Sequence, residues 1–175
     1  MTAPLIDHIA ILVPDLEEAI ARWTAATGYE FSPIVRYRAT HFVDDSDPEP
    51  HLSDTRLSLT REGPPRVELM EATGTGVHGP AQLGVHHIGF APASIDIPSK
   101  VEQLAVLGIG QDGAALTSDG ETLLWFSDKI GLGGIRLAFV SHIPGPVVAD
   151  DGSPLWRNPE TGRSSPWGPP EGVTS

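Results

Sequence analysis

The sequence predicts an α+β fold made of two successive βαβββ modules, one in residues 5–72 and one in residues 84–141. Two observations support this prediction. The 19 glycines and 17 prolines among 175 residues interrupt the chain too often for long helices to dominate. The same order of one strand, one helix and three strands also occurs twice along the chain. Such an internal repeat is typical of two units that pack about a pseudo-twofold axis.

The two halves of the chain match closely in spacing. A strand-like run around His8 opens the first half, and a similar run around His87 opens the second. Each run is followed by a helical pattern that ends at a glycine. Twenty positions separate His8 from Gly28, and twenty-one separate His87 from Gly108. Neither half could bury both faces of its small sheet alone, so we expect the halves to share a core.

The remaining elements follow in order. Pro14 ends the first strand, Asp15 is the expected N-cap, and the apolar face of a helix over residues 16–27 includes Leu16 and Trp23. Strands are then expected at 31–38, 52–61 and 66–72, with an acidic, proline-containing surface loop at 44–50. In the second module we expect a strand at 84–90, a helix at 97–107 and strands at 111–116, 121–127 and 134–141.

The composition changes after the second module. Residues 144–175 contain seven prolines and five glycines and show no periodicity, which predicts a domain over 1–143 followed by an extended tail. The tail nevertheless carries Trp156 and Trp167, which a disordered segment seldom needs. We expect it to wrap over its own domain or over a partner subunit, and we expect a homodimer that covers the remaining apolar surface.

Charge and composition limit the partners. The chain has 11 basic against 23 acidic residues and a net charge of −12, so a nucleic-acid partner is not expected. The absence of cysteine excludes disulfides, thiolate metal ligands and a cysteine nucleophile. No apolar run approaches the length of a membrane span, and the N-terminus lacks the pattern of a signal peptide. We therefore expect a cytoplasmic protein without a membrane partner.

Four segments resemble a known superfamily. They are Asp7–Ile11, Asp15–Ala19, Val67–Glu71 and Gly84–Phe90, the last reading Gly-Val-His-His-Ile-Gly-Phe. They are similar to the vicinal oxygen chelate superfamily (glyoxalase, bleomycin resistance and extradiol dioxygenase proteins), with the closest similarity to methylmalonyl-CoA epimerases. The resemblance covers roughly residues 4–142. It implies a cupped mixed sheet around one cavity, which binds a small-molecule substrate.

The resemblance also implies a metal site. Carried over by position, its ligand positions are His8, Glu68, His87 and Arg136. Strand periodicity adds that His86 and His87 point to opposite faces, so that at most one is a ligand, and the alignment with His8 selects His87. The expected metal is a divalent ion (Fe, Mn, Co, Ni or Zn), or none.

Arg136 departs from the superfamily pattern, because the epimerases and glyoxalases have a glutamate at the corresponding position and a guanidinium cannot coordinate a cation. One possibility is a metal held by His8, Glu68 and His87 alone, with open positions for substrate or oxygen. The other is an ion pair between Arg136 and Glu68 in place of the metal.

In both cases Arg136 is a candidate catalytic and substrate-binding residue, because a cation in an apolar strand needs an anionic partner. A surface acid could also be that partner. Trp125 and Phe126 are most simply core aromatics. The alternative is that one of them lines the cavity, with Trp125 as the candidate substrate-binding residue. The histidines in expected loops (41, 51, 78 and 142) are given no role.

Three functions are compatible with these features. The first is a metal-assisted isomerase, epimerase or lyase acting on a small enolisable or vicinally oxygenated substrate. The second is an extradiol-type Fe(II) dioxygenase using the same two histidines and one carboxylate. The third is a metal-free protein that sequesters a ligand, as resistance proteins of this superfamily do. Metal content and reaction with catechols would separate them.

Overall fold

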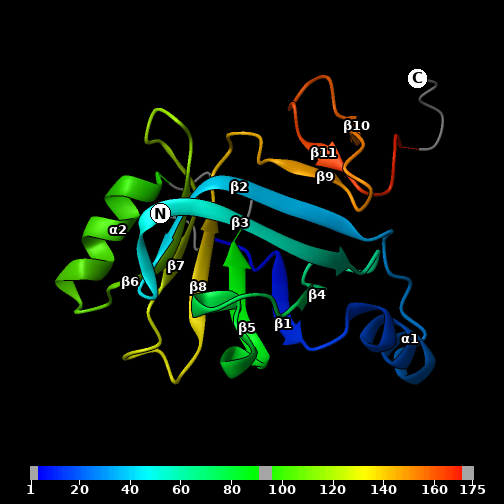
Figure 1. Cartoon of the computed structure of the whole chain (residues 1–175), viewed down its shortest axis with the longest axis horizontal. Helices are drawn as coiled ribbons and strands as arrows, with labels where there is room; N and C mark the ends of the chain where they lie inside the picture. The colour runs from blue at the N-terminus through cyan, green and yellow to red at the C-terminus, as the bar shows by residue number, and fades with distance from the viewer. Residues whose placement is uncertain (1–3, 91–95, 171–175) are drawn as a thin grey trace.

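The computed structural model of the chain describes residues 4–90 and 96–170 (Figure 1). The predicted domain and tail therefore both include residues that lie outside the described part, namely 1–3, 91–95 and 171–175.

Two modules of the same element order make up the domain. The first consists of β1 (His8–Val13), α1 (Leu16–Thr27), β2 (Val35–Asp44), β3 (Asp47–Leu59) and β4 (Arg66–Glu71). Two short 3₁₀ turns follow, η1 (Gly76–His78) and η2 (Pro80–Gln82). The second consists of β5 (Gly84–Phe90), α2 (Ile97–Val106), β6 (Gln111–Leu116), β7 (Thr122–Ser127) and β8 (Arg136–Val140). The predicted fold class is thus confirmed.

The strands β1 to β8 close into a barrel. Their order is β3-β4-β1-β5-β8-β7-β6-β2, and an additional pairing between β2 and β3 joins the two ends. In each module the first strand pairs in parallel with the last, β1 with β4 and β5 with β8. The modules join where β1 meets β5 and where β2 meets β6, both antiparallel. This equivalence of the joins reflects the internal repeat of the sequence.

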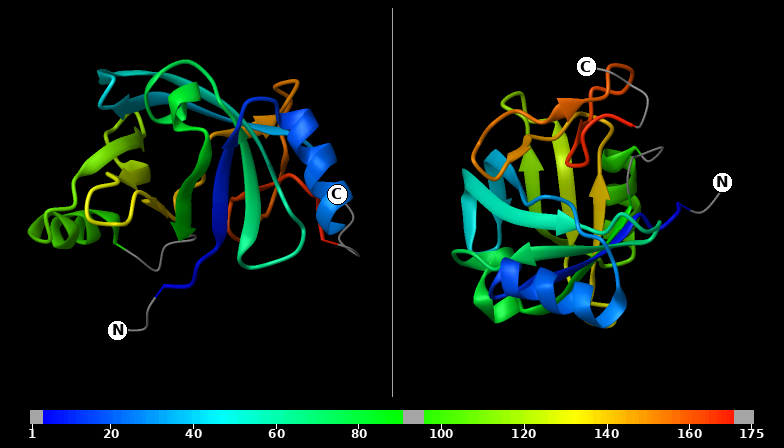
Figure 2. Two further views of the ribbon diagram at one scale, coloured as in Figure 1. Left: turned by 90° about the horizontal axis from the view of Figure 1, so that it is seen from below. Right: turned by 90° about the vertical axis from the view of Figure 1, so that its right-hand side faces the viewer.

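The helices cover the outside of the barrel at opposite ends of the molecule (Figures 1 and 2). The apolar face of α1, which includes Leu16 and Trp23, packs on Leu69 of β4. The buried face of α2 packs on Trp125 and Phe139 of the second module. Asp15 caps α1 as predicted, because its side chain accepts a hydrogen bond from the backbone N–H of Glu18 at 2.8 Å. Two further apolar clusters lie inside the barrel, one around Phe42 and Phe126 and one around Leu12 and Met70.

The predicted loop at 44–50 is wrong, because β2 and β3 continue into a long hairpin that turns only at residues 45 and 46. The carboxylate of Asp44 makes this turn possible. One of its oxygens accepts hydrogen bonds from the backbone N–H groups of Ser46 and Asp47, at 2.9 and 3.0 Å. The other accepts from the backbone N–H of Val77 at 3.2 Å. The acidic side chain of Asp44 thus holds the turn from within, which a count of charges and prolines does not reveal.

The C-terminal tail folds over its own domain. Its strand β9 (Val147–Ala149) pairs with β2, and β10 (Trp156–Arg157) pairs with β11 (Ser164–Ser165). Figure 2 shows this segment, in orange and red, lying across one end of the barrel. Trp156 and Trp167 are both partly buried there, so the apolar surface that motivates the homodimer is smaller than expected, and the homodimer stays a prediction. None of the described helices is long and apolar enough to cross a membrane.

Candidate active site

A cavity of about 230 Å³ lies inside the barrel. Strands of both modules contribute to its wall, and the C-terminal tail supplies a further part. Most of the wall is apolar, with side chains such as Leu57, Met70, Leu124 and Phe126. His8, Glu68 and His87 are the polar groups that converge on one point of this wall.

These three side chains form a compact ligand set. The Nε2 atoms of His8 and His87 are 3.0 Å apart, and Glu68 Oε2 is 3.6 Å from each of them. All three residues are buried. A point equidistant from the three atoms is about 2 Å from each, which is the length of a metal–nitrogen or metal–oxygen bond in proteins. The residues present therefore fit a divalent ion.

Hydrogen bonds fix the protonation of His87. His86 Nε2 lies 2.7 Å from the backbone oxygen of Val77, which can only accept, so this nitrogen carries the proton. The Nδ1 atom of neutral His86 is then an acceptor for His87 Nδ1–H, at 2.8 Å. His87 therefore presents the lone pair of Nε2 to the cavity, as a metal ligand must.

His8 is oriented in the same way from the other module. Its Nδ1 donates to the carboxylate of Asp7 at 2.9 Å, and the second oxygen of Asp7 accepts from Arg66 at 3.3 Å. This leaves Nε2 of His8 directed at His87 and Glu68. Partners of this kind beyond the ligands fix the tautomer and orientation of a ligating imidazole and raise its basicity.

The charges of the set follow from its burial. Burial lowers the pKa of His87 well below its usual value and lowers that of His86 to about 3, so both rings are neutral. Burial also opposes a charge on His8, but the carboxylates of Glu68 and Asp7 outweigh it and raise the pKa of His8.

The prediction that His86 and His87 point to opposite faces is wrong. Ala10 of β1 pairs with His87, whereas Ile11 pairs with Val85, so His86 is an extra residue in β5. This β-bulge turns both imidazoles toward the interior, where each contacts the ring of Phe126. Strict alternation in the strand would have lost the hydrogen bond that orients His87.

Gly89 makes room for His8. The two residues are opposite one another on β5 and β1, and a Cβ atom at position 89 would lie 2.1 Å from Nε2 of His8. A side chain there would displace the imidazole from the cavity. Glycine at this position is therefore part of the site, although its backbone is unexceptional.

The strand register corrects the position of the expected fourth ligand. Glu68 pairs with Ala10, two residues after His8. The equivalent position in the second module pairs with Gly89, two residues after His87, and is Ala138. Ala138 is fully buried and packs in the cluster that contains Phe126. The position of the superfamily glutamate is thus occupied by a methyl group, not by a guanidinium.

Arg136 instead corresponds to Arg66 by register. The alternative of an ion pair between Arg136 and Glu68 does not hold, because Arg136 pairs with Asp112. Its Nε donates to the carboxylate of Asp112 on β6 at 2.5 Å, and a second nitrogen donates to Gln82 at 3.2 Å. Arg136 is not among the residues that line the cavity. A catalytic role for Arg136 stays a prediction, and the geometry gives no reason to retain it.

Of the two expected aromatics, Phe126 lines the cavity and Trp125 does not. Trp125 points to the opposite face of β7 and packs under α2 with Phe139. The prediction of Trp125 as the substrate-binding aromatic is therefore not supported, since alternation in the strand gives that position to its neighbour.

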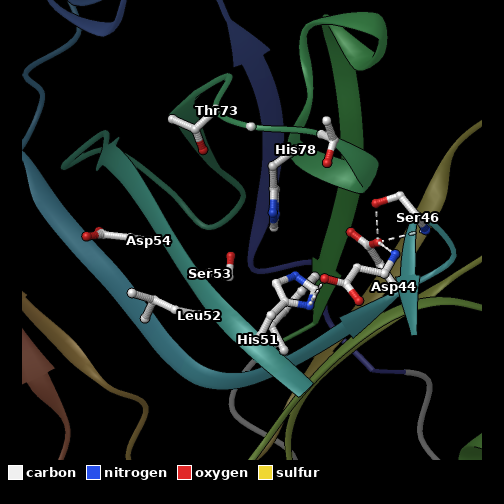
Figure 3. A pocket seen from close by; sticks show the side chains of 12 residues that line it. Asp44, Ser46, His51, Leu52, Ser53, Asp54, Thr73 and His78 are labelled. Atoms are coloured by element: carbon white, nitrogen blue, oxygen red, sulfur yellow. Dashed lines mark hydrogen bonds and ion pairs between the residues drawn. The ribbon is translucent and has the colours of Figure 1, made fainter. Parts of the chain in front are cut away.

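Sequence reasoning missed His78, which lies in η1 rather than in an open loop and is buried. Its ring stacks on His86 and borders both the cavity and a second, more polar hollow. Figure 3 shows this second hollow, with hydrogen-bonded Asp44 and Ser46 on one side and Asp54 on the other. Only its proximity in space to His86 identifies His78, so no local pattern in the sequence could have found it.

Comparison with known proteins agrees with this geometry. Residues 7–121 match the Glyoxalase/Bleomycin resistance protein/Dioxygenase superfamily, and the chain belongs to this superfamily. No curated protein matches the sequence.

Similar solved structures support the fold. One is a methylmalonyl-CoA epimerase in complex with methylmalonyl-CoA and NH4+, with 19% identity, a TM-score of 0.51 and coverage of 80% of this chain and 95% of that one. A Streptomyces coelicolor methylmalonyl-CoA epimerase variant in complex with 2-nitronate-propionyl-CoA has 19% identity, a TM-score of 0.51 and coverage of 80% and 98%. A hypothetical protein from Bacillus halodurans has 13% identity, a TM-score of 0.53 and coverage of 80% and 95%. At these identities the similarity establishes the fold.

Proposed function

We propose that the protein is a metal-dependent enzyme of the isomerase, epimerase or lyase type, acting on a small enolisable substrate. The observation that carries this proposal is the convergence of His8, Glu68 and His87, with both imidazoles oriented by hydrogen bonds behind them. These three residues would hold the ion. When bound, it would supply a Lewis acid that polarises a substrate carbonyl and makes the adjacent C–H bond acidic.

The chain's own residues supply the remaining requirements. The apolar wall excludes water from the reacting end of the substrate, which strengthens electrostatic interactions there. A proton acceptor is also needed. Of the cavity-lining groups outside the ligand set, Asp7 is engaged by His8 and Arg66, and burial raises the pKa of Tyr37 so that its phenol stays protonated.

His78 remains as the proton acceptor. Burial lowers its pKa to about 4, with a smaller contribution from the charge of Arg136, so the ring is neutral at neutral pH and can accept a proton. It belongs to the cavity wall and has no side-chain hydrogen bond within the described part of the chain. We therefore assign His78 the proton-transfer role in the proposed reaction.

A second candidate function is ring-opening dioxygenation with Fe(II). Two histidines and one carboxylate with open positions are the ligand set of many non-haem Fe(II) oxygenases, and the methyl group of Ala138 contributes no fourth ligand. The metal-free alternative has lost its main structural argument, because Arg136 does not neutralise Glu68.

The test begins with chelator-treated protein titrated with Co²⁺, Mn²⁺ or Zn²⁺ by calorimetry. We expect one ion per chain, no measurable binding in His87→Ala, and unchanged binding in His142→Ala, which removes an exposed histidine away from the cavity. The metal-loaded protein is then incubated in D₂O with small 2-oxo acids and thioesters, and NMR follows exchange of the proton next to the carbonyl. His78→Gln should bind the ion normally and lose this exchange.

Two outcomes would reject the proposed activity. Absence of stoichiometric metal binding would leave a ligand-sequestering protein. Yellow ring-opened product from catechols under air, with Fe(II) and without proton exchange, would establish the dioxygenase instead.

A further inference from the structure

The C-terminal tail forms part of the cavity wall. Gly145, Val147, Arg163, Ser164 and Pro166 all line it, together with Tyr37 of β2. The solved structures that resemble this protein cover 80% of the chain, and the superfamily match ends at residue 121, before the tail begins. The tail, which lies outside the matched residues and after the second βαβββ module, therefore adds wall to a cavity that the two modules form.

Three polar atoms on this part of the wall have no partner. They are Tyr37 Oη, Arg163 Nη1 and Ser164 Oγ, each buried and without a hydrogen bond in the described part of the chain. A buried polar group without a partner is costly, and more so when the group is charged. Three such atoms around one cavity indicate a ligand that accepts hydrogen bonds from all of them.

The charge of Arg163 specifies the sign of that ligand. No carboxylate forms an ion pair with Arg163 among the described residues. The acid that senses its charge is Asp7: burial alone would raise the pKa of Asp7, but His8, Arg66 and Arg163 together lower it. Asp7 is already hydrogen-bonded to His8 and to Arg66, so the guanidinium of Arg163 is left for an anion.

The tail is held firmly enough to present Arg163. The carboxylate of Asp150 accepts hydrogen bonds from Arg36 of β2 at 3.0 Å and from Arg56 of β3 at 3.0 and 3.1 Å. After Arg163, the ring of Trp167 lies under the guanidinium of Arg61, 4.0 Å from its centroid. Anchors on both sides of Arg163 hold this part of the backbone at the cavity wall.

We propose that Arg163, Ser164 and Tyr37 form a carboxylate-binding subsite, so that the substrate is a small acid with an apolar body. The guanidinium would pair with the carboxylate, and the two hydroxyl groups would donate to its oxygens. The cavity of about 230 Å³ and its apolar wall set the size and nature of the remainder. The claim that the bound acid is the substrate rests on the proposed function. Binding of the acid at the subsite does not require a metal.

Calorimetry on chelator-treated protein tests the subsite separately from the metal. The probes are phenylacetate and 3-methylbutanoate, each compared with its neutral amide, which has nearly the same shape. We expect both acids to bind at least about tenfold more tightly than their amides, since hydrogen bonds to a charged group are stronger than those to a neutral one. Arg163→Gln should remove this preference, and Arg157→Gln, on an exposed position of the same tail, should keep it.

Tyr37→Phe provides a variant that does not endanger the fold, because it deletes an unpaired hydroxyl and keeps the ring. We expect it to weaken acid binding severalfold with an unchanged or higher Tm. Equal affinity for acid and amide, no measurable binding of either acid, or an Arg163→Gln variant that keeps the preference would overturn the subsite. The two proposals can be separated with His87→Ala, which should lose Co²⁺ binding and keep acid binding. The metal site can therefore be rejected without rejecting the subsite, and the subsite can be rejected without rejecting the metal site.

Discussion

The two modules have the same topology but contribute unequally to the site. Each provides one imidazole from its first strand, and in each the preceding residue binds the Nδ1 atom of that imidazole: Asp7 for His8, His86 for His87. The fourth strands differ. Register places Glu68 on β4 where β8 has Ala138. The two modules thus share backbone positions, while the side chains at equivalent positions differ, so that three candidate metal ligands are present instead of four.

The arginines at equivalent positions also differ in their partners. Arg66 donates to Asp7 and so supports the orientation of His8. Arg136 pairs with Asp112 on the neighbouring strand and contacts no ligand. An arginine at the same position of the repeat therefore supports the site in the first module, whereas in the second module it only joins two neighbouring strands.

The largest expected effect comes from removing a ligand. His87→Ala should lower Co²⁺ affinity more than about 100-fold, because even the outer partner of a ligand is worth about 10–100-fold. The same change at His8 should have a similar effect, since the two positions are equivalent. Calorimetric titration measures both. If one variant keeps wild-type affinity, the two imidazoles do not share an ion.

Arg136 should affect stability and not metal binding. Arg136→Met leaves Asp112 without its partner, and we expect a loss of about 2–3 kcal/mol in the free energy of unfolding, toward the low end for a buried pair because Asp112 is partly exposed. Arg136→Met with Asp112→Leu should recover part of this loss. Urea unfolding of the wild type, the two single variants Arg136→Met and Asp112→Leu, and the double variant gives the coupling energy of the pair. If Arg136→Met instead lowers the Co²⁺ affinity strongly and leaves the stability unchanged, Arg136 has a role in the metal site.

The partners behind the imidazoles should have an intermediate effect. Asp7→Asn keeps a hydrogen-bond acceptor for His8 but removes the charge, and we expect a fall in Co²⁺ affinity of about 10–100-fold. Glu62→Gln, an exposed acid elsewhere in the first module, serves as the control and should change nothing. An equal effect in both variants would mean that only the net charge of the protein matters.

Ala138→Glu is the most informative change, because it restores the symmetry of the two modules. The buried carboxylate would destabilise the metal-free protein by about 1–3 kcal/mol through overpacking and further through the burial of an unpaired charge, and Co²⁺ should recover the part that comes from the charge. Ala138→Gln has the same size without the charge and should show the loss without the recovery. Thermal unfolding with and without Co²⁺ distinguishes them. Equal behaviour of the two variants would show that position 138 does not face the ion.

Much of this site could be predicted from the sequence because its features are local. The spacing of His8 and His87 from their helices and the apolar runs around them indicate the repeat, and the resemblance adds Glu68. Helix α1 could be placed closely because Asp15 and Gly28 mark its ends chemically.

The sequence-based predictions that are wrong, by contrast, concern features that depend on how strands pair. The shift from Arg136 to Ala138 is a matter of parallel register, which depends on which backbone groups meet across β5 and β8. The β-bulge at His86 likewise exists only relative to β1. The roles of His78 and Arg163 depend on distant segments that reach the same cavity, so composition and periodicity carry no signal for them.

The most direct test of the central claim is X-ray absorption on the Co²⁺-loaded wild-type protein. We expect one cobalt per chain, with fine structure that requires two imidazole ligands and the remaining positions filled by oxygen from Glu68 and solvent. Cobalt bound at less than stoichiometric amounts, or a coordination shell without imidazole, would contradict the assignment of His8, Glu68 and His87 as a metal site.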